Sequence, residues 1–166
     1  THTQSSAASD VYKRQAEGRL ILADALAYAS KHYDPEYMLD FATLTGAVVI
    51  TLGHIATGIM SNNETLVENI KVSSDNTGEH VWQLPLWDEY CDQVKSDIAD
   101  VKNMGSTGQA GTIAGGAFLK AFVGKDIPWA HFDVAGTSYH VENRSYIQKN
   151  SASGQVIRLV LDMLGA

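Results

Sequence analysis

The feature that most constrains the fold of this chain is the alternation of short apolar runs with segments of helical periodicity. The run 37–44 (Tyr-Met-Leu-Asp-Phe-Ala-Thr-Leu) is mostly apolar, which is typical of a strand buried in a parallel sheet. Residues 19–33, just before it, place Leu22, Leu26 and Ala29 at helical spacing. We therefore predict an α/β fold, a three-layer α/β/α sandwich around a mostly parallel, mixed central sheet.

The alternation continues along the rest of the chain and predicts the remaining elements. Further extended segments are expected at 56–60, 82–86 and 128–134, and further helices at 45–52, 64–73, 87–94, 112–123 and 154–164. Thr112 is the expected N-cap of its helix, because a threonine hydroxyl can accept a free amide of the first turn. Gly53 is expected to end the helix 45–52, since glycine tolerates the left-handed conformation common after a helix.

Length, charge and cysteine content narrow the classes of protein to which the chain can belong. Its 166 residues suffice for one domain with a sizeable core. The formal net charge of −7 argues against nucleic acid as the main partner, because phosphate binding requires a basic surface. No apolar run approaches the roughly 20 residues that cross a bilayer, so we expect no membrane partner. Cys91 is the only cysteine, which excludes an internal disulfide and indicates a reducing compartment.

Two motifs near the expected helix starts are weak signals when taken alone. Glu17 and Arg19 lie two residues apart where the chain enters a helix, and charged side chains are common there for electrostatic reasons. The glycines in the range 105–116 do not make a phosphate-binding loop, because no Gly-Lys-Ser/Thr follows them. Neither motif identifies an activity without further matches.

The remaining titratable residues favour structural interpretations. His131 lies inside an apolar run and is expected to be a core histidine. Three aspartates could be imagined as a metal cluster: Asp97, Asp100 and Asp133. We expect them instead to cap loops or to pair with Lys102 and nearby amides.

Several sequence blocks occur together and in a fixed order. They are Ala-Glu-Gly-Arg-Leu at 16–20, Ala-Thr-Leu-Thr-Gly-Ala at 42–47, Asp-Ile-Ala-Asp-Val-Lys-Asn at 97–103, Ala-Gly-Thr-Ile at 110–113, Trp-Ala-His-Phe-Asp-Val-Ala-Gly at 129–136 and Ser-Ala-Ser-Gly at 151–154. Together they resemble the leucyl aminopeptidase (cytosol aminopeptidase) family of di-metal peptidases. The resemblance covers nearly all of residues 16–166.

The resemblance implies a function and a cellular setting. Members of the family are cytoplasmic homo-hexamers that release N-terminal residues, leucine preferred, from peptides by two-metal hydrolysis with manganese or zinc ions. This chain would correspond to the C-terminal part of the catalytic domain, truncated at its N-terminus and so incomplete as a sandwich. Two divalent ions suit this chemistry because they generate a hydroxide near neutral pH and polarise the scissile carbonyl.

The resemblance also assigns roles to individual residues. Glu17 matches a bridging metal ligand, and Arg19 matches a catalytic arginine that holds a bicarbonate. The substrate-binding residues implied are Thr43, Leu44, Gly46, Ala135 and Ser138. The carbonyl of Leu44 and the amide of Gly46 would bond the peptide backbone, and the other three residues would line the pocket for the first side chain.

The chain departs from the family at the start of the first block. Lys13, Arg14 and Gln15 stand where the family has Asn-Thr-Asp, so that an amide replaces one carboxylate ligand, and the other ligands would lie upstream. Residues 1–15 are expected to be a disordered, non-native leader, and the chain as written is expected to be inactive alone. Two alternatives stay open: a diverged family member, and a non-catalytic assembly or DNA-binding relative, although the acidic charge disfavours DNA.

Overall fold

A four-stranded mixed sheet forms the centre of the protein. The computed structural model describes residues 17–103, 109–139, 141 and 151–165. The strands are β1 (Met38–Ala42), β2 (Thr57–Ser61), β3 (Val81–Gln83) and β4 (Trp129–Asp133), in the order β1-β4-β2-β3. β1 is parallel to β4 and β2 is parallel to β3, whereas β2 and β4 are antiparallel. The predicted mostly parallel, mixed sheet is confirmed.

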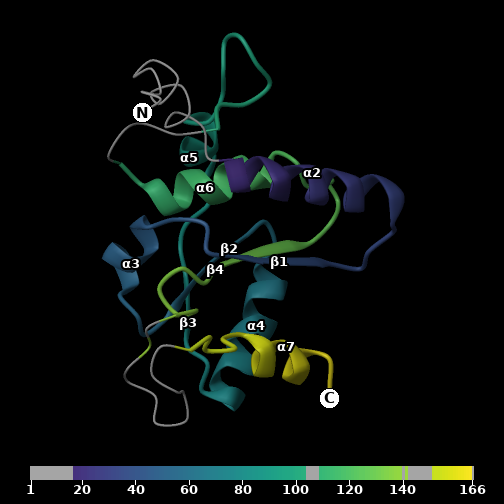
Figure 1. Cartoon of the computed structure of the whole chain (residues 1–166). Helices are drawn as coiled ribbons and strands as arrows, with labels where there is room; N and C mark the ends of the chain where they lie inside the picture. The colour runs from purple at the N-terminus through teal and green to yellow at the C-terminus, as the bar shows by residue number, and fades with distance from the viewer. Residues whose placement is uncertain (1–16, 104–108, 140, 142–150, 166) are drawn as a thin grey trace, which may run out of the picture.

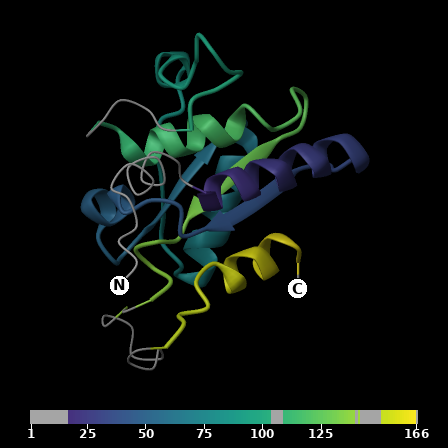
Figure 2. The same cartoon turned by 45° about the horizontal axis from the view of Figure 1, so that its top comes forward.

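Helices cover both faces of this sheet, as Figure 1 shows. On one face lie α2 (Glu17–His32), α5 (Asp88–Asp92) and α6 (Gly111–Lys120), and Figure 2 shows α2 and α6 side by side across it. On the other face lie α4 (Glu64–Thr77) and α7 (Ile157–Met163), which pack against each other. The short helix α3 (Ala47–Leu52) follows β1 at one end of the sheet. This arrangement is the predicted three-layer sandwich.

The alternation of side chains along β4 separates the core into two layers. Trp129 packs with α2 and α6 residues such as Leu26 and Phe118. Ala130 and Phe132 point to the opposite face and pack with the core residues of α4 and α7, among them Val67, Ile70 and Leu159. All five residues of β4 are buried, because the strand lies inside the sheet with helices on both sides.

The predicted end of the helix 45–52 is confirmed, whereas α4 runs four residues beyond its predicted end at 73. Gly53 ends α3 with a φ of 64°, in the left-handed region that glycine tolerates. Asn63 caps α4, its side-chain oxygen accepting the Leu66 amide at 2.9 Å. Gly78 ends α4 with a φ of 68°.

Some boundaries differ from the prediction. α6 begins after Ala110, which is left-handed with a φ of 44°, so Thr112 is not the N-cap. The Thr112 side chain is instead buried and bonded to another hydroxyl, as described below. α7 begins at Ile157, not 154, after a left-handed Val156 with a φ of 68°. The third strand ends at Gln83, shortly before Pro85, which has no amide to extend a ladder.

Two further expectations concern the start of the chain and membrane-spanning helices. Residues 1–15, expected to be a disordered leader, lie outside the described residues. Within the described ranges, no helix combines the length and the apolar character needed to cross a bilayer.

Candidate functional site

The candidate site lies where β1 and β4 end. Because the two strands are parallel and paired from Met38–Trp129 to Ala42–Asp133, their carboxyl ends meet at one edge of the sheet. The loop 43–46 leaves β1 there, and the loop 134–138 leaves β4 beside it. Ligands of α/β proteins commonly bind at this kind of edge, between the loops that follow neighbouring strands.

Asp133, the last residue of β4, joins the two loops. Its side chain is fully buried. Oδ1 accepts the backbone amides of Leu44 at 3.1 Å and Ala135 at 3.2 Å. Oδ2 accepts the hydroxyl of Thr45 at 2.7 Å. One carboxylate therefore holds the main chain after β1 against the main chain after β4.

A second layer of hydroxyl contacts connects this carboxylate to the neighbouring helices. Because the Thr45 hydroxyl donates to Asp133, the Thr112 hydroxyl in α6 donates to Thr45, across 3.0 Å. Thr45 Oγ1 also accepts the Val48 amide in the first turn of α3, at 3.2 Å. All of these groups are buried. The start of α3 and the start of α6 are thus tied to the same point as the two loops.

Arg19 brings a buried positive charge to the same region. It lies in the first turn of α2 with 9% of its surface exposed. Its Nη1 donates to the Asn103 carbonyl at 2.5 Å, and its Cζ lies 5.9 Å from the centre of the Phe118 ring. The buried Nε has no hydrogen-bond partner among the described residues. Burial lowers the pKa of the Arg19 guanidinium, and the negative charge of Asp133 acts in the opposite direction.

Gly115 explains how α6 approaches this group so closely. A Cβ at this position would lie 3.0 Å from Leu44 Cδ2, 3.3 Å from Arg19 Nη2 and 3.3 Å from Thr45 Cγ2. Glycine therefore lets the helix pack directly over the arginine and the β1 loop. The arrangement places Arg19 next to the loop that Asp133 holds.

The structure brings some of the predicted substrate-binding residues together. Leu44 and Ala135 are both half-buried and share Asp133 Oδ1. Thr43 and Gly46 are exposed on either side of the Leu44–Thr45 pair, with Gly46 at the N-cap of α3. Whether these residues bind a substrate stays a prediction, because their placement alone does not test it.

Ser138 and Gly136 complete the loop after β4. Ser138 is half-buried, and its carbonyl accepts the Ser153 amide at 3.0 Å. The Gly136 carbonyl lies 2.6 Å from His54 Nδ1. A Cβ on Gly136 would lie 2.2 Å from the Gly53 carbonyl oxygen, so only glycine fits there. Ser138 thus lies at the far end of the loop from Asp133, anchored to residues near the C-terminus.

Sequence reasoning did not single out Asp133 or Thr45 as site residues. Both lie inside blocks that carried the resemblance, 129–136 and 42–47, which was the available signal. The prediction that Asp133 pairs with nearby amides is confirmed by its bonds to Leu44 and Ala135. What could not be anticipated is that the two amides belong to loops that follow different strands.

His131 is confirmed as a core histidine. Its ring is fully buried two residues before Asp133, with Nδ1 at 2.5 Å from Asp40 Oδ1. The other oxygen of Asp40 accepts the indole Nε1–H of Trp129 at 2.7 Å. This network links β1 and β4 on the face covered by α2 and α6. It fixes the pairing of the two strands whose ends form the candidate site.

The described residues do not by themselves fit a two-metal centre. Within those ranges no group of three or more His, Cys, Asp or Glu side chains is placed so that it could hold a metal ion. Glu17 is the first residue of α2, but its side chain lies outside the described part of the chain. Its predicted role as a metal ligand therefore stays a prediction.

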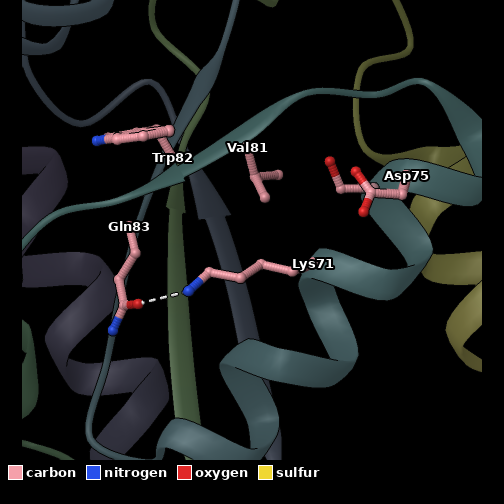
Figure 3. A pocket seen from close by; sticks show the side chains of 6 residues that line it. Lys71, Asp75, Val81, Trp82 and Gln83 are labelled. Carbon is pink, nitrogen blue, oxygen red and sulfur yellow. Dashed lines mark hydrogen bonds between the residues drawn. The ribbon is translucent and has the colours of Figure 1, made fainter.

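A separate hollow lies on the other side of the sheet, between α4 and β3. It has a volume of about 400 Å³ and is lined by residues that include Lys71, Asp75 and Trp82. Figure 3 shows Lys71 reaching Gln83, whose Oε1 accepts the ammonium at 3.0 Å. The hollow shares no residue with the predicted site.

Comparison with known proteins agrees with the placement of these blocks. The model of the cytosol aminopeptidase family, catalytic domain, matches residues 2–161. Probable cytosol aminopeptidases from Desulfotalea psychrophila and Geobacter sp. (strain M21) are 49% and 50% identical over 156 and 155 residues, which is 94% and 93% of this chain. One from Chlorobaculum parvum is 46% identical over 162 residues, or 98% of the chain.

These alignments cover little of the relatives themselves. The chain spans 30%, 31% and 32% of the length of the three proteins. The match nevertheless includes both loops at the carboxyl edge of β1 and β4 and the first turn of α2. On this evidence the chain belongs to the cytosol aminopeptidase family.

Proposed function

We propose that this chain carries part of the catalytic site of a metal-dependent leucyl aminopeptidase that releases N-terminal residues, leucine preferred, from peptides. The observation that supports the proposal most strongly is the buried Arg19. Its guanidinium lies beside the Leu44 loop with one nitrogen unpartnered among the described residues. A buried cation with spare hydrogen-bonding capacity is expensive to maintain, and such groups are common at functional sites.

The loops would bind the substrate through their main chain and small side chains. Leu44 would accept from the peptide with its carbonyl, and Gly46 would donate to the peptide with its amide. Thr43, Ala135 and Ser138 would line the pocket for the first side chain. This assignment is supported by the bond of the Leu44 amide to buried Asp133, which fixes the orientation of that peptide unit.

Arg19 would hold an anion, and bicarbonate fits its chemistry. The buried Nε of Arg19 has no partner among the described residues and can donate to an oxygen of such an anion. Burial strengthens the interaction, because the effective dielectric constant is lower than in water. Bound bicarbonate would supply a proton acceptor, and Arg19 would keep it in place.

The metal ions, the assembly and the location extend the proposal beyond the described residues. Glu17 would supply one carboxylate to a pair of manganese or zinc ions, with further ligands from outside the described residues. The working enzyme would be a cytoplasmic homo-hexamer acting on peptides.

Hydrolysis of L-leucine p-nitroanilide in the presence of manganese or zinc tests the proposal. The assay compares the chain as written with a chimera in which residues 16–166 replace the corresponding part of the Geobacter relative. Within the chimera, Arg19→Met is expected to lower kcat by about 10²-fold, the usual effect of losing one electrostatic contact to the reacting groups. Lys31→Gln, an exposed change in the last turn of the same helix, is the matched control.

The outcomes separate the alternatives. Activity in the chimera that is lost with Arg19→Met and kept with Lys31→Gln supports the proposal. A folded chimera without activity would favour a non-catalytic assembly role. Activity of the chain as written would show that the expected inactivity of this chain alone is wrong.

A further inference from the structure

We infer that Asp133 is the positioning residue of this site, holding the two substrate loops in one arrangement beside Arg19. It is the buried group that contacts both loops through a single oxygen atom, with the Leu44 amide at 3.1 Å and the Ala135 amide at 3.2 Å. The link to substrate rests on the proposed function. The positioning itself rests only on the contacts described above.

The first argument is geometric. Parallel strands β1 and β4 define where their loops begin, but a loop can turn in many directions after the last ladder bond. Asp133 removes this freedom on both sides at once, because Oδ1 accepts one amide from each loop and Oδ2 accepts the Thr45 hydroxyl. Hydrogen bonds to an ionised carboxylate are about twice as strong as neutral ones. The relative position of Leu44 and Ala135 is therefore set by one side chain.

The second argument is electrostatic. Arg19 and Asp133 are both buried, so the negative charge of Asp133 partly offsets the cost of burying the guanidinium. Both oxygens of Asp133 are already bonded to Leu44, Ala135 and Thr45, so it supports the cation through its field. This leaves Arg19 Nε, which has no partner among the described residues, available for another group. Asp133 thus holds the loops directly and stabilises the buried guanidinium without occupying its donors.

Backbone amide hydrogen exchange in the 166-residue chain tests the positioning role. Asp133→Asn keeps the shape of the side chain but loses its charge, and Asp133→Ala removes every contact. We expect exchange at Leu44 and Ala135 to rise together, roughly tenfold or more for Asp133→Ala and by a smaller factor for Asp133→Asn. Amides elsewhere in β4, such as Phe132, should keep their protection.

Two further variants separate the two oxygens and control for the loss of a buried hydroxyl. Thr45→Val removes the bond to Oδ2 and the acceptor of the Val48 amide, so exchange should rise at Val48 and stay low at Leu44 and Ala135. Ser61→Ala removes a buried hydroxyl bond to the Trp129 carbonyl at the other end of β4. It should leave all three amides unchanged. If Asp133→Ala does not fold, Asp133→Asn and Thr45→Val still decide the question.

Kinetics in the chimera add a readout that a purely structural role would not move. Asp133→Asn should raise KM for L-leucine p-nitroanilide about tenfold and also lower kcat, whereas Thr45→Val, which leaves both bonds to Oδ1 in place, should change KM and kcat much less. Unchanged exchange at Leu44 and Ala135 in both Asp133 variants would overturn the inference. Unchanged KM and kcat for Asp133→Asn in an active chimera would also overturn it. If the unmodified chimera is inactive while the paired exchange response is present, the proposed function fails and the positioning role stands.

Discussion

Two buried carboxylates in different layers of the protein both accept hydrogen bonds from main-chain amides, but the arginines near them differ in burial. Asp133 lies at the carboxyl edge of β4 under α6, and Glu79 lies below the sheet where α4 gives way to β3. Glu79 Oε2 accepts the Leu159 amide of α7 at 3.0 Å, and its Oε1 lies 3.4 Å from Arg158 Nη2. Each carboxylate therefore accepts at least one main-chain amide from a segment distant in sequence.

The difference lies in the cation near each carboxylate. The side chain of Arg158 is 48% exposed to solvent, so its charge remains hydrated. It also contacts Glu79 directly. Arg19 is buried, forms no direct hydrogen bond with Asp133 in the described part of the structure and keeps a nitrogen without a partner among the described residues. Glu79, paired with a hydrated arginine, holds α7 against the core. Asp133 instead lies near a buried arginine with an unpartnered nitrogen among the described residues, and it is this arginine that we propose holds a ligand.

The largest expected effect comes from removing Asp133. Asp133→Ala leaves two amides without their acceptor and Arg19 without its nearby negative charge, which should lower the free energy of unfolding by about 3–5 kcal/mol. Urea-induced unfolding followed by tryptophan fluorescence measures this. In the background of Arg19→Met the same change should cost less, because the uncompensated buried cation is gone.

The same double-mutant measurement can be made with Glu79→Ala in place of Asp133→Ala. Glu79→Ala should cost the same free energy whether or not Arg19 is present, because the two residues share no partner in the described chain. Equal costs of Asp133→Ala in both backgrounds would show that Arg19 and Asp133 are independent. That result would remove the electrostatic distinction between the two regions.

Glu79→Ala is expected to have the next largest effect. The Leu159 amide is buried and would lose its partner, and α7 would lose its connection to the end of α4, at a cost of about 2 kcal/mol. Cleavage by trypsin after Arg158 should become faster, since the first turn of α7 opens more often. A cleavage rate equal to that of the unmodified chain would show that apolar packing alone holds α7.

Gly136→Ala tests the loop of the Asp133 region while leaving the carboxylate in place. The added Cβ would lie 2.2 Å from the Gly53 carbonyl oxygen, so the loop 134–138 or the end of α3 must move. We expect a loss of about 1–3 kcal/mol, typical of overpacking. Gly18→Ala is a suitable control, because a Cβ there meets no atom within 4 Å. Equal unfolding free energies for the two variants would contradict the close approach.

Much of the fold could be predicted from local sequence because local physics decides it. The apolar run of β1 and the helical spacing of Leu22 and Leu26 place their elements without reference to other parts of the chain. The start of α6 could not be placed in this way. Thr112 has the chemistry of an N-cap, but its hydroxyl bonds Thr45, 67 residues away in sequence. Tertiary contacts overrode the local preference.

The candidate site was predictable only in part for the same reason. The blocks indicated Arg19, Leu44 and Ala135, and the structure places them at one edge of the sheet. Asp133 was interpreted as a loop cap, which is correct for its bond to Ala135. Its bond to Leu44 spans 89 residues, and pairing of β1 with β4 is needed to see it. Contacts between distant segments carry the functional information that single motifs lack.

The smallest expected effect concerns an exposed ion pair, for which we expect no measurable change in the free energy of unfolding. Lys95 Nζ lies 2.6 Å from Asp92 Oδ1, and a side-chain hydrogen bond to Asp92 raises the pKa of Lys95. A raised lysine pKa stabilises the folded state at pH values below the ordinary lysine pKa. This contribution is lost as the pH rises through the raised pKa, which happens only in strong alkali. Both side chains are exposed and screened by solvent, so Lys95→Met should leave the unfolding midpoint in urea at pH 7 unchanged. A midpoint shift approaching that of Glu79→Ala would show that exposure, used above to separate Arg158 from Arg19, does not determine what a charge contributes in this protein.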